Sequence, residues 1–229
     1  MSITPQETDL FSLLEHRYSV RGFTDQVIEK TVLQEIFQKS QQAPSNCNTQ
    51  PWQAYVISGE RCRQFAKSLA EAIVGGAPSK PDFDVTLGFF DEYRQRQVDC
   101  AYALYGSMGI ERGDKAGRGA AMLRNYDFFG APHVAFIAMP KSFGIVNALD
   151  VGIYLQTLNL VMESYGVGSC IQGALAYYPD LVRKELGLPE DDSMQILCGI
   201  SFGYEDKNHA ANNTRTVRAD LGENVSFYE

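Results

Sequence analysis

The residues best suited to bind an anion lie near the N-terminus, in the run Arg17-Tyr18-Ser19-Val20-Arg21. In an extended segment, alternate side chains share one face, so Arg17, Ser19 and Arg21 would point the same way. Two guanidinium groups and a hydroxyl on one face suit a phosphate, which accepts charge-assisted hydrogen bonds. The spacing equally fits a solvated basic surface paired with acids, and a short basic pattern does not decide between the two.

A second candidate is the loop from Ala43 to Trp52, with the sequence APSNCNTQPW. Six hydrogen-bonding side chains stand between its two prolines, immediately before an expected strand. Such a loop offers several hydrogen bonds to a polyhydroxylated or heteroaromatic ligand at little ordering cost. The alternative is an ordinary loop with Asx turns, and Trp52 is most simply a core residue at the start of the strand.

A third candidate is the segment from Gly168 to Ala174, which follows a long apolar stretch. Glycine and small residues at a strand end let a planar ligand approach the backbone and its N–H groups. Cys170 could also be a nucleophile, but no histidine is near it in sequence. None of the three histidines shows a catalytic pattern, so we expect a buried structural thiol.

The C-terminal part adds Arg215 and Arg218, which by themselves predict only a solvated surface. No GxGxxG follows a strand and no GxxxxGK[ST] is present, so neither a Rossmann dinucleotide site nor a P-loop is indicated. No metal site is expected, because the acidic residues that cluster in the middle of the chain are too irregularly placed: Asp82, Asp84, Asp91 and Glu92.

The composition bounds the class of protein. The chain has 229 residues, and its 20 basic and 28 acidic side chains give a net charge of −8, which argues against a nucleic-acid-binding surface. Its hydrophobic content of 45% indicates a globular protein, and its length suits a single domain. The five scattered cysteines without CxxC spacing are typical of reduced thiols. With no signal sequence and no apolar stretch of about 20 residues, we expect a cytoplasmic protein without a membrane partner.

Hydrophobic periodicity predicts alternating helices and strands. We expect a first helix ending near residue 16 and further helices over 29–41, 61–73, 89–105, 115–126, 148–165 and 181–186. Strands are expected over 52–57, 133–139, 166–171 and 194–202, with a further edge strand over 225–228. Residues 75–88 are the most loop-like part of the chain. The pattern fits an α+β or α/β sheet flanked by helices in one domain.

In this order, the four segments resemble the nitroreductase family of FMN-dependent NAD(P)H oxidoreductases. Residues 17–21 look like the family's R-x-S-x-[RK] opening, and residues 44–52 like its P-S-x-x-N-x-Q-P-W loop. Residues 168–173 fall where the family has its flavin-facing strand end, and Arg218 resembles its late phosphate-contacting arginine.

The resemblance implies an α+β sandwich with a mixed, mostly antiparallel sheet flanked by helices, forming an intertwined homodimer with one FMN at each of two sites between the subunits. The phosphate and ribityl chain would be held by Arg17, Tyr18, Ser19, Arg21 and Arg218. The partner subunit would supply Pro44, Ser45, Asn46, Asn48 and Gln50. The flavin face and edge would lie along the backbone of Cys170, Ile171, Gln172 and Gly173, with an N–H of Gln172 or Gly173 directed at N5.

Departures from the family pattern matter as well. Thr216 stands where smaller members often carry a lysine, so either Arg215 takes that role or no residue does. An insert at about 75–113 is longer than in the smallest members and would form a lid over the substrate. With residues 122–132, it resembles the branch that acts on nitroaromatics, and Asn125 is a candidate flavin contact. That branch is also similar to flavin-dependent iodotyrosine deiodinases.

The implied reaction is ping-pong: NADPH or NADH reduces the flavin, which then reduces a nitroaromatic or a quinone. The cofactor performs the chemistry, so no catalytic side chain is expected. Two alternatives stay open, a flavin-dependent reductive dehalogenase of the deiodinase kind and a non-catalytic flavin-binding protein. The whole chain, 1–229, would be one FMN-binding domain.

Overall fold

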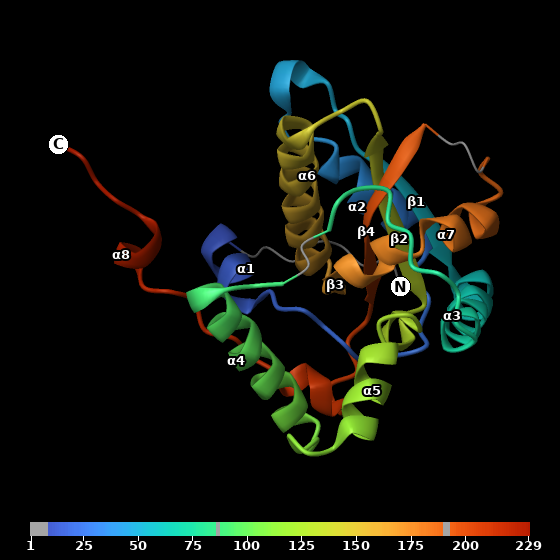
Figure 1. The fold of residues 1–229 in the computed structure, drawn as a ribbon. Coiled ribbons are helices and arrows are strands. Elements are labelled where there is room, and N and C mark those ends of the chain that lie inside the picture. Colours follow the sequence, from blue (N-terminus) through green and yellow to red (C-terminus); the bar gives the residue numbers. More distant parts are fainter. Residues whose placement is uncertain (1–8, 86–87, 190–192) are drawn as a thin grey trace.

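A four-stranded antiparallel sheet forms the centre of the protein. The computed structural model describes residues 9–85, 88–189 and 193–229. The strands are β1 (Gln53–Ser58), β2 (His133–Pro140), β3 (Gly168–Gln172) and β4 (Met194–Gly203), in the order β1-β2-β4-β3 (Figure 1). Strands β1 and β3 are therefore the two edges of the sheet, and the predicted α+β class is confirmed.

The alternation of side chains along β2 creates two cores, one on each face of the sheet. Val134 and Phe136 point into the first core, whereas Ala135 and Ile137 point into the second. Nearly every residue of β2 and β4 is buried, because helices cover both faces of these central strands. A bulge between Ile137 and Ala138 shifts the register of β2 against β4.

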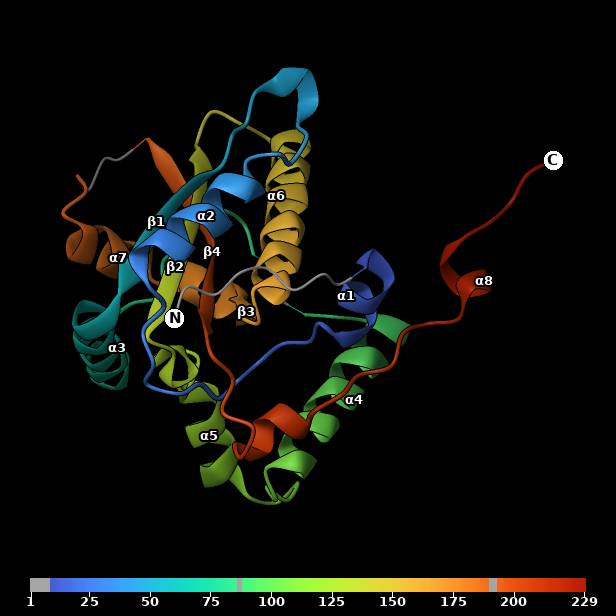
Figure 2. The same cartoon turned by 180° about the vertical axis from the view of Figure 1, so that it is seen from behind.

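Helices pack on both faces of the sheet, which makes the sandwich visible in Figures 1 and 2. Helices α2 (Lys30–Ser40) and α6 (Ile145–Ser164) contribute to one core, and α3 (Gly59–Val74) and α7 (Pro179–Leu186) to the other. The remaining helices are α1 (Leu10–His16), α4 (Asp91–Ser107), α5 (Lys115–Leu123) and α8 (Leu221–Asn224). Short 3-10 segments are η1 (Asn46–Asn48), η2 (Phe128–Gly130), η3 (Gly173–Tyr177) and η4 (Ala210–Asn213).

Helix α6 carries apolar residues on both sides. One side packs into the core through residues such as Tyr154 and Leu158, both completely buried. The other side leaves an apolar stripe exposed: Ile145, Val146, Leu149 and Ile153. By length and composition α6 is a helix that could cross a membrane, so the expectation that no such stretch exists is wrong. In this structure α6 is a core helix, and its apolar stripe is exposed to solvent in the single chain.

The insert at 75–113 begins as a loop and continues as α4; its residues 86–87 lie outside the described part. Asp82 attaches the loop to the body, because its buried carboxylate accepts a hydrogen bond from Arg183 and another from the N–H of Ile196, at 2.9 Å. By contrast, neither α4 nor α5 contains a buried residue. The two helices therefore form a loosely packed extension of the fold.

Two expected elements differ from the structure. The helix expected over 115–126 ends at Leu123, where a turn leads into η2. The edge strand expected over 225–228 is wrong for the single chain, since no strand lies there within the described residues. That tail stands away from the body in Figure 1, and a strand forms only where another strand can pair with it.

Candidate functional site

An arginine-lined cavity of about 420 Å³ joins the two ends of the chain. Its walls come from the end of α1, from residues 17–21, from Cys100 of α4 and from residues 214–218. Of the residues predicted to hold a phosphate, Arg17, Tyr18, Ser19, Arg21 and Arg218 all line this cavity. The structure thus brings together the two basic segments that the sequence separates by almost its whole length. We call it the arginine pocket.

The sheet edge holds the first of these segments in place. Ser19 forms a parallel bridge with Ser169 of β3, and the N–H of Val20 donates to the carbonyl of Ser169 at 3.1 Å. The segment is therefore extended there, as predicted, and Val20 turns into the core while Ser19 and Arg21 stay half-buried at the pocket. This bridge also supplies the one parallel pairing beside an otherwise antiparallel sheet in the described chain.

The C-terminal segment is fixed by Asn212, a residue that the sequence analysis missed. Its buried side chain donates to the carbonyl of Gly22 at 2.8 Å and accepts from the N–H of Arg21 at 2.7 Å. Gly22 also packs so closely on His209 that an added Cβ would lie 2.2 Å from the ring. The two segments that form the pocket are therefore joined through the backbone next to Arg21. No local pattern in the sequence predicts this connection.

Arg215 lies in the same pocket, with its guanidinium carbon 3.6 Å from the centre of the Tyr18 ring. The Tyr18 hydroxyl donates to Glu205, and burial followed by this carboxylate raises the pKa of Tyr18 to about 12. Arg218, which is exposed like Arg215, donates within the described chain only to the carbonyls of Thr216 and Val217 and to the Thr216 hydroxyl. Arg215 is thus the better anchored of the two late arginines, although Arg218 alone is predicted by the motif.

The backbone of β3 is the second part of the site. Because β3 is an edge strand, its outer side has no neighbouring strand in the described chain beyond the bridge at Ser169. The Gln172 side chain is buried and turned inwards, where it accepts from Ser201 and donates to the carbonyl of Asn125 at 2.8 Å. Its backbone and that of Gly173 stay at the edge, and Asn125, the candidate flavin contact, lies beside this strand end.

Cys170 has the character of a structural thiol. It is buried, and burial raises the pKa of its thiol despite the opposing effect of nearby Arg21. A thiol kept protonated is a poor nucleophile. Its neighbour Ile171 is exposed at 42%. The structure therefore favours backbone contacts from this segment over covalent chemistry by the cysteine.

The polar loop at residues 44–50 lies elsewhere. The N–H of Asn46 donates to Asp150 near the start of α6 at 2.9 Å, whereas β3 contacts Asn159 through Ser169. Asp150 and Asn159 are nine positions apart on α6, about 14 Å along the helix axis. In Figures 1 and 2, η1 lies at one end of α6 and α1 at the other. Within one chain, the loop is thus not assembled with the arginine pocket.

The conformation of this loop is unusual. Three of its non-glycine residues have positive φ, namely Cys47 at 50°, Asn48 at 56° and Gln50 at 46°. Ser45 accepts a hydrogen bond from the N–H of Gln50 at 2.9 Å and stabilises the turn. Such strained residues persist where the surroundings hold them, often at binding sites. The side chains expected to contact a ligand are turned to solvent: Pro44, Asn46, Asn48 and Gln50.

The comparisons with known proteins decide the family. A model of the nitroreductase family matches residues 14–204, and this range contains the opening motif, the polar loop and β3. The chain belongs to the nitroreductase family. A relative from Mycolicibacterium smegmatis, named nitroreductase NfnB, is 37% identical over 94% of this chain and 91% of its own. A 4-nitrobenzoate reductase from Pseudomonas putida is 35% identical over 92% of this chain and 91% of its own.

Solved structures agree with this membership. The FMN- and NADPH-dependent nitroreductase NfnB from Sphigopyxis sp. strain HMH superimposes with a TM-score of 0.91 at 35% identity, over 97% of this chain and all of that one. The FMN-dependent NfnB from Mycobacterium smegmatis, solved in complex with NADPH, gives a TM-score of 0.89 over 96% of this chain and all of that one. The fold of this family member is therefore the nitroreductase fold.

Proposed function

We propose that this family member is an FMN-dependent oxidoreductase that uses NADPH or NADH to reduce nitroaromatics or quinones. The observation that carries the proposal is the arginine pocket, built from both ends of the chain beside the free edge of β3. In a chain of net charge −8, a phosphate needs such a concentrated cationic site. When bound, FMN would supply the redox chemistry between the nicotinamide nucleotide and the substrate.

The residues of the pocket hold the phosphate and the ribityl chain. Arg17, Ser19 and Arg21 bind from the N-terminal side, and Arg215 joins Arg218 on the C-terminal side. Thr216 stands where smaller family members often carry a lysine, and Arg215 supplies the positive charge in its place. The backbone of Cys170, Ile171, Gln172 and Gly173 lies along the flavin, with N–H donors that stabilise negative charge without titrating.

The polar loop reaches the cofactor of a second copy. Residues 44–50 are distant from the arginine pocket of their own chain, yet their amide side chains are exposed and held in a strained conformation. A homodimer resolves this separation by placing the loop of one copy over the pocket of the other. Ser45, Asn46, Asn48 and Gln50 then contact the ribityl chain and the ring system.

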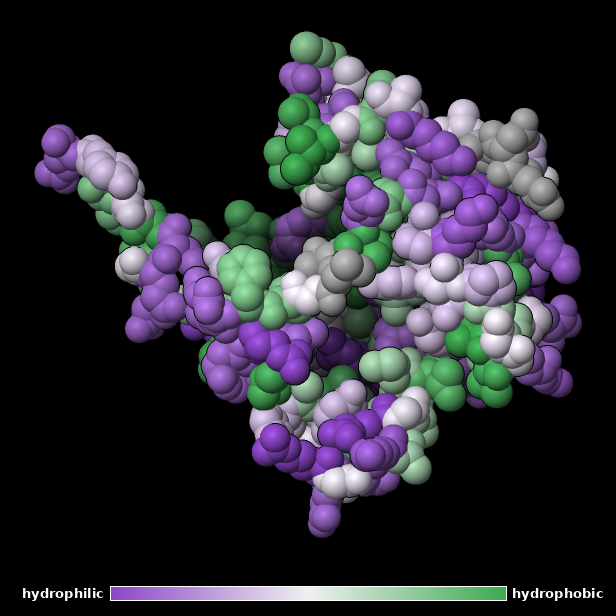
Figure 3. Space-filling view, in the orientation of Figure 1, coloured by the Kyte–Doolittle hydropathy of each residue, from purple (hydrophilic) through white to green (hydrophobic). Residues whose placement is uncertain are grey.

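Exposed apolar residues support such a dimer. The stripe on α6 covers its first turns, where Figure 3 shows hydrophobic residues gathered, and α1 separately exposes Leu10, Phe11 and Leu14. The C-terminal tail also exposes large apolar side chains: Val217, Leu221, Val225, Phe227 and Tyr228. Large exposed apolar areas of this kind mark interaction surfaces. The tail would wrap the second copy, where residues 225–228 find the strand partner that they lack in a single chain.

The substrate preference follows from the relatives. Those reported above are named for nitroreductase or 4-nitrobenzoate reductase activity, and this favours nitro-group reduction over reductive dehalogenation. The insert at 75–113 would act as the lid, because its helix α4 borders the arginine pocket through Cys100 and has no buried residue. The five free thiols suit the cytoplasm, where the nicotinamide nucleotides are reduced.

The test is an absorbance spectrum of the purified protein, followed by anaerobic addition of NADPH and, separately, NADH. We expect a flavin spectrum that is bleached by at least one nucleotide and restored by a nitroaromatic, and a dimer on size-exclusion chromatography. A colourless protein that takes up no added FMN would refute the proposal. Bound flavin that neither nucleotide reduces would instead identify a non-catalytic flavin-binding protein.

A further inference from the structure

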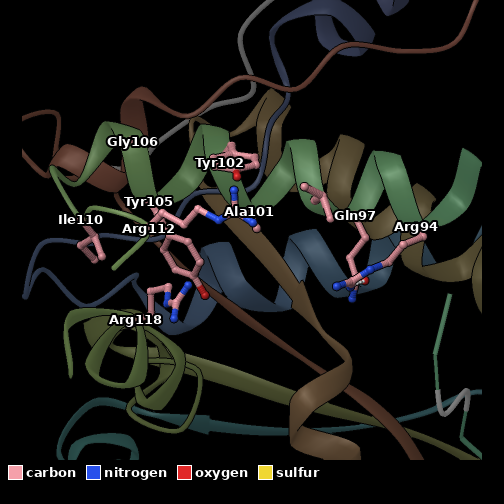
Figure 4. A pocket seen from close by; sticks show the side chains of 10 residues that line it. Arg94, Gln97, Ala101, Tyr102, Tyr105, Gly106, Ile110, Arg112 and Arg118 are labelled. Atoms are coloured by element: carbon pink, nitrogen blue, oxygen red, sulfur yellow. Dashed lines mark hydrogen bonds between the residues drawn. The ribbon is translucent and has the colours of Figure 1, made fainter. Parts of the chain in front are cut away.

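A second cavity, of about 370 Å³, lies between α4 and α5 on the side of α4 away from the arginine pocket. Cys100 lines the arginine pocket, whereas the next residue, Ala101, lines this cavity (Figure 4). One helix thus separates the proposed flavin phosphate site from a distinct hollow. We call this hollow the α4–α5 cavity.

The α4–α5 cavity is positively charged. Three arginines line it, Arg94, Arg112 and Arg118, and no acidic residue is among the lining residues. Within the described ranges, none of the three takes part in a salt bridge. Arg94 donates to Gln97, and no carboxylate of the described chain neutralises the three guanidinium groups, so the cavity can offer their charge to an anion.

The charge is divided between the two ends of the cavity. Figure 4 shows Arg112 and Arg118 near Tyr105 at one end, and Arg94 with Gln97 at the other. The wall between them is apolar and aromatic, formed by Val98, Ala101 and Tyr102. Arginine and tyrosine both stack on flat aromatic rings. The arrangement suits a ligand with an aromatic body and two separate anionic groups.

We propose that the α4–α5 cavity binds the adenosine half of NADPH, with the 2′-phosphate at Arg112 and Arg118 and the pyrophosphate facing Arg94. This inference rests on the proposed function, because it gives the nicotinamide nucleotide its second anchor. An aromatic carboxylate substrate has one anionic group and would leave one cationic end unpaired. The flavin phosphate already has the arginine pocket. The preference for NADPH, for which the sequence contains no motif, thus resides in the α4–α5 cavity, between the insert and α5.

Direct binding provides the first test, with 2′,5′-ADP titrated into the FMN-loaded protein in a calorimeter. We expect wild-type protein to bind 2′,5′-ADP at least about tenfold more tightly than 5′-AMP, since each charge-assisted hydrogen bond contributes strongly. Arg118→Ala and Arg112→Ala should each weaken 2′,5′-ADP binding about tenfold. The matched control is Arg63→Ala, an exposed arginine of α3 that pairs with Glu60 far from the cavity and should leave binding unchanged.

Steady-state kinetics provides the second test. In Arg118→Ala and Arg112→Ala, the KM for NADPH should rise about tenfold, while the KM for NADH and kcat stay within twofold of wild type. Equal use of the two nucleotides by all variants, or wild-type binding of 2′,5′-ADP by both variants, would overturn the inference. So would a rise in the KM for 4-nitrobenzoate alone, which would assign the cavity to the substrate. Each of these outcomes leaves flavin reduction intact and is therefore distinct from a failure of the proposed function.

Discussion

The guanidinium of Arg215 lies 3.6 Å from the centre of the Tyr18 ring, although almost the whole chain separates the two residues. The contact holds the C-terminal segment against the N-terminal one, and both residues line the arginine pocket. Glu205 completes the arrangement by accepting the tyrosine hydroxyl. The pocket therefore depends on a cation–π contact that no motif in the sequence describes.

Two substitutions at Tyr18 separate the ring from the hydroxyl. Tyr18→Phe keeps the ring under Arg215 but leaves Glu205 without its donor, so we expect a loss of about 1 kcal/mol in the free energy of unfolding and little change in FMN affinity. Tyr18→Leu also removes the cation–π contact and should weaken FMN binding about fivefold. Chemical denaturation and flavin titration measure the two effects. Identical FMN affinities in both variants would show that the contact of Arg215 with the Tyr18 ring does not contribute to FMN binding.

Arg21→Ala should weaken FMN retention. Removing one partner of a half-buried charge pair costs about 2–5 kcal/mol, which corresponds to at least tenfold in affinity. The backbone N–H of Arg21, which donates to Asn212, is unaffected by the substitution. The flavin-to-protein absorbance ratio after gel filtration measures retention, with Arg63→Ala as control. Equal ratios for Arg21→Ala and wild type would exclude Arg21 from the phosphate site.

Asn48 tests the contribution of the polar loop. With φ at 56°, this position accepts glycine without strain, so Asn48→Gly removes the amide and keeps the backbone. We expect a shifted flavin absorbance maximum and a slower reductive half-reaction in stopped flow, at unchanged stability. Asn48→Ala should show the same changes together with a small loss of stability, since alanine disfavours positive φ. An unaltered half-reaction in Asn48→Gly would remove Asn48 from the site.

Stability should fall in mildly acidic solution because of His133. This residue is fully buried, accepts the N–H of Ile28 at Nε2 (2.9 Å) and contacts Ser58 through Nδ1 (2.8 Å), and burial lowers its pKa from 6.5 to about 4. Since the folded-state pKa lies below the unfolded one, the neutral ring stabilises the protein fully above pH 6.5. That contribution, at most about 3 kcal/mol, is lost progressively as the pH falls towards 4.

The measurement is the free energy of unfolding of wild type and His133→Gln between pH 7 and pH 4. As the pH falls, the free energy of unfolding of wild type should decrease more than that of His133→Gln, because only wild type gains a proton on His133 when it unfolds. If the free energies of unfolding of wild type and His133→Gln changed equally with pH, His133 would not be the source of the acid sensitivity.

Local patterns in the sequence determined much of this protein. Alternation along residues 17–21 predicts the shared face of Arg17, Ser19 and Arg21, because the period of an extended chain is a local property. Alternation and apolar runs likewise predict β2 and α6, and the ordered motifs predict the family. The boundaries differ by a few residues, since capping and turns compete at the ends of elements.

Only the tertiary structure decided which of these segments meet. The order β1-β2-β4-β3 makes β3 an edge and seats Ser19 beside Ser169, while it leaves the loop at 44–50 at the other end of α6. The contact of Arg215 with Tyr18 depends on packing, and so does the α4–α5 cavity. Such contacts join residues far apart in sequence, and their stability comes from the burial and pairing of the whole sheet, which no local spacing records.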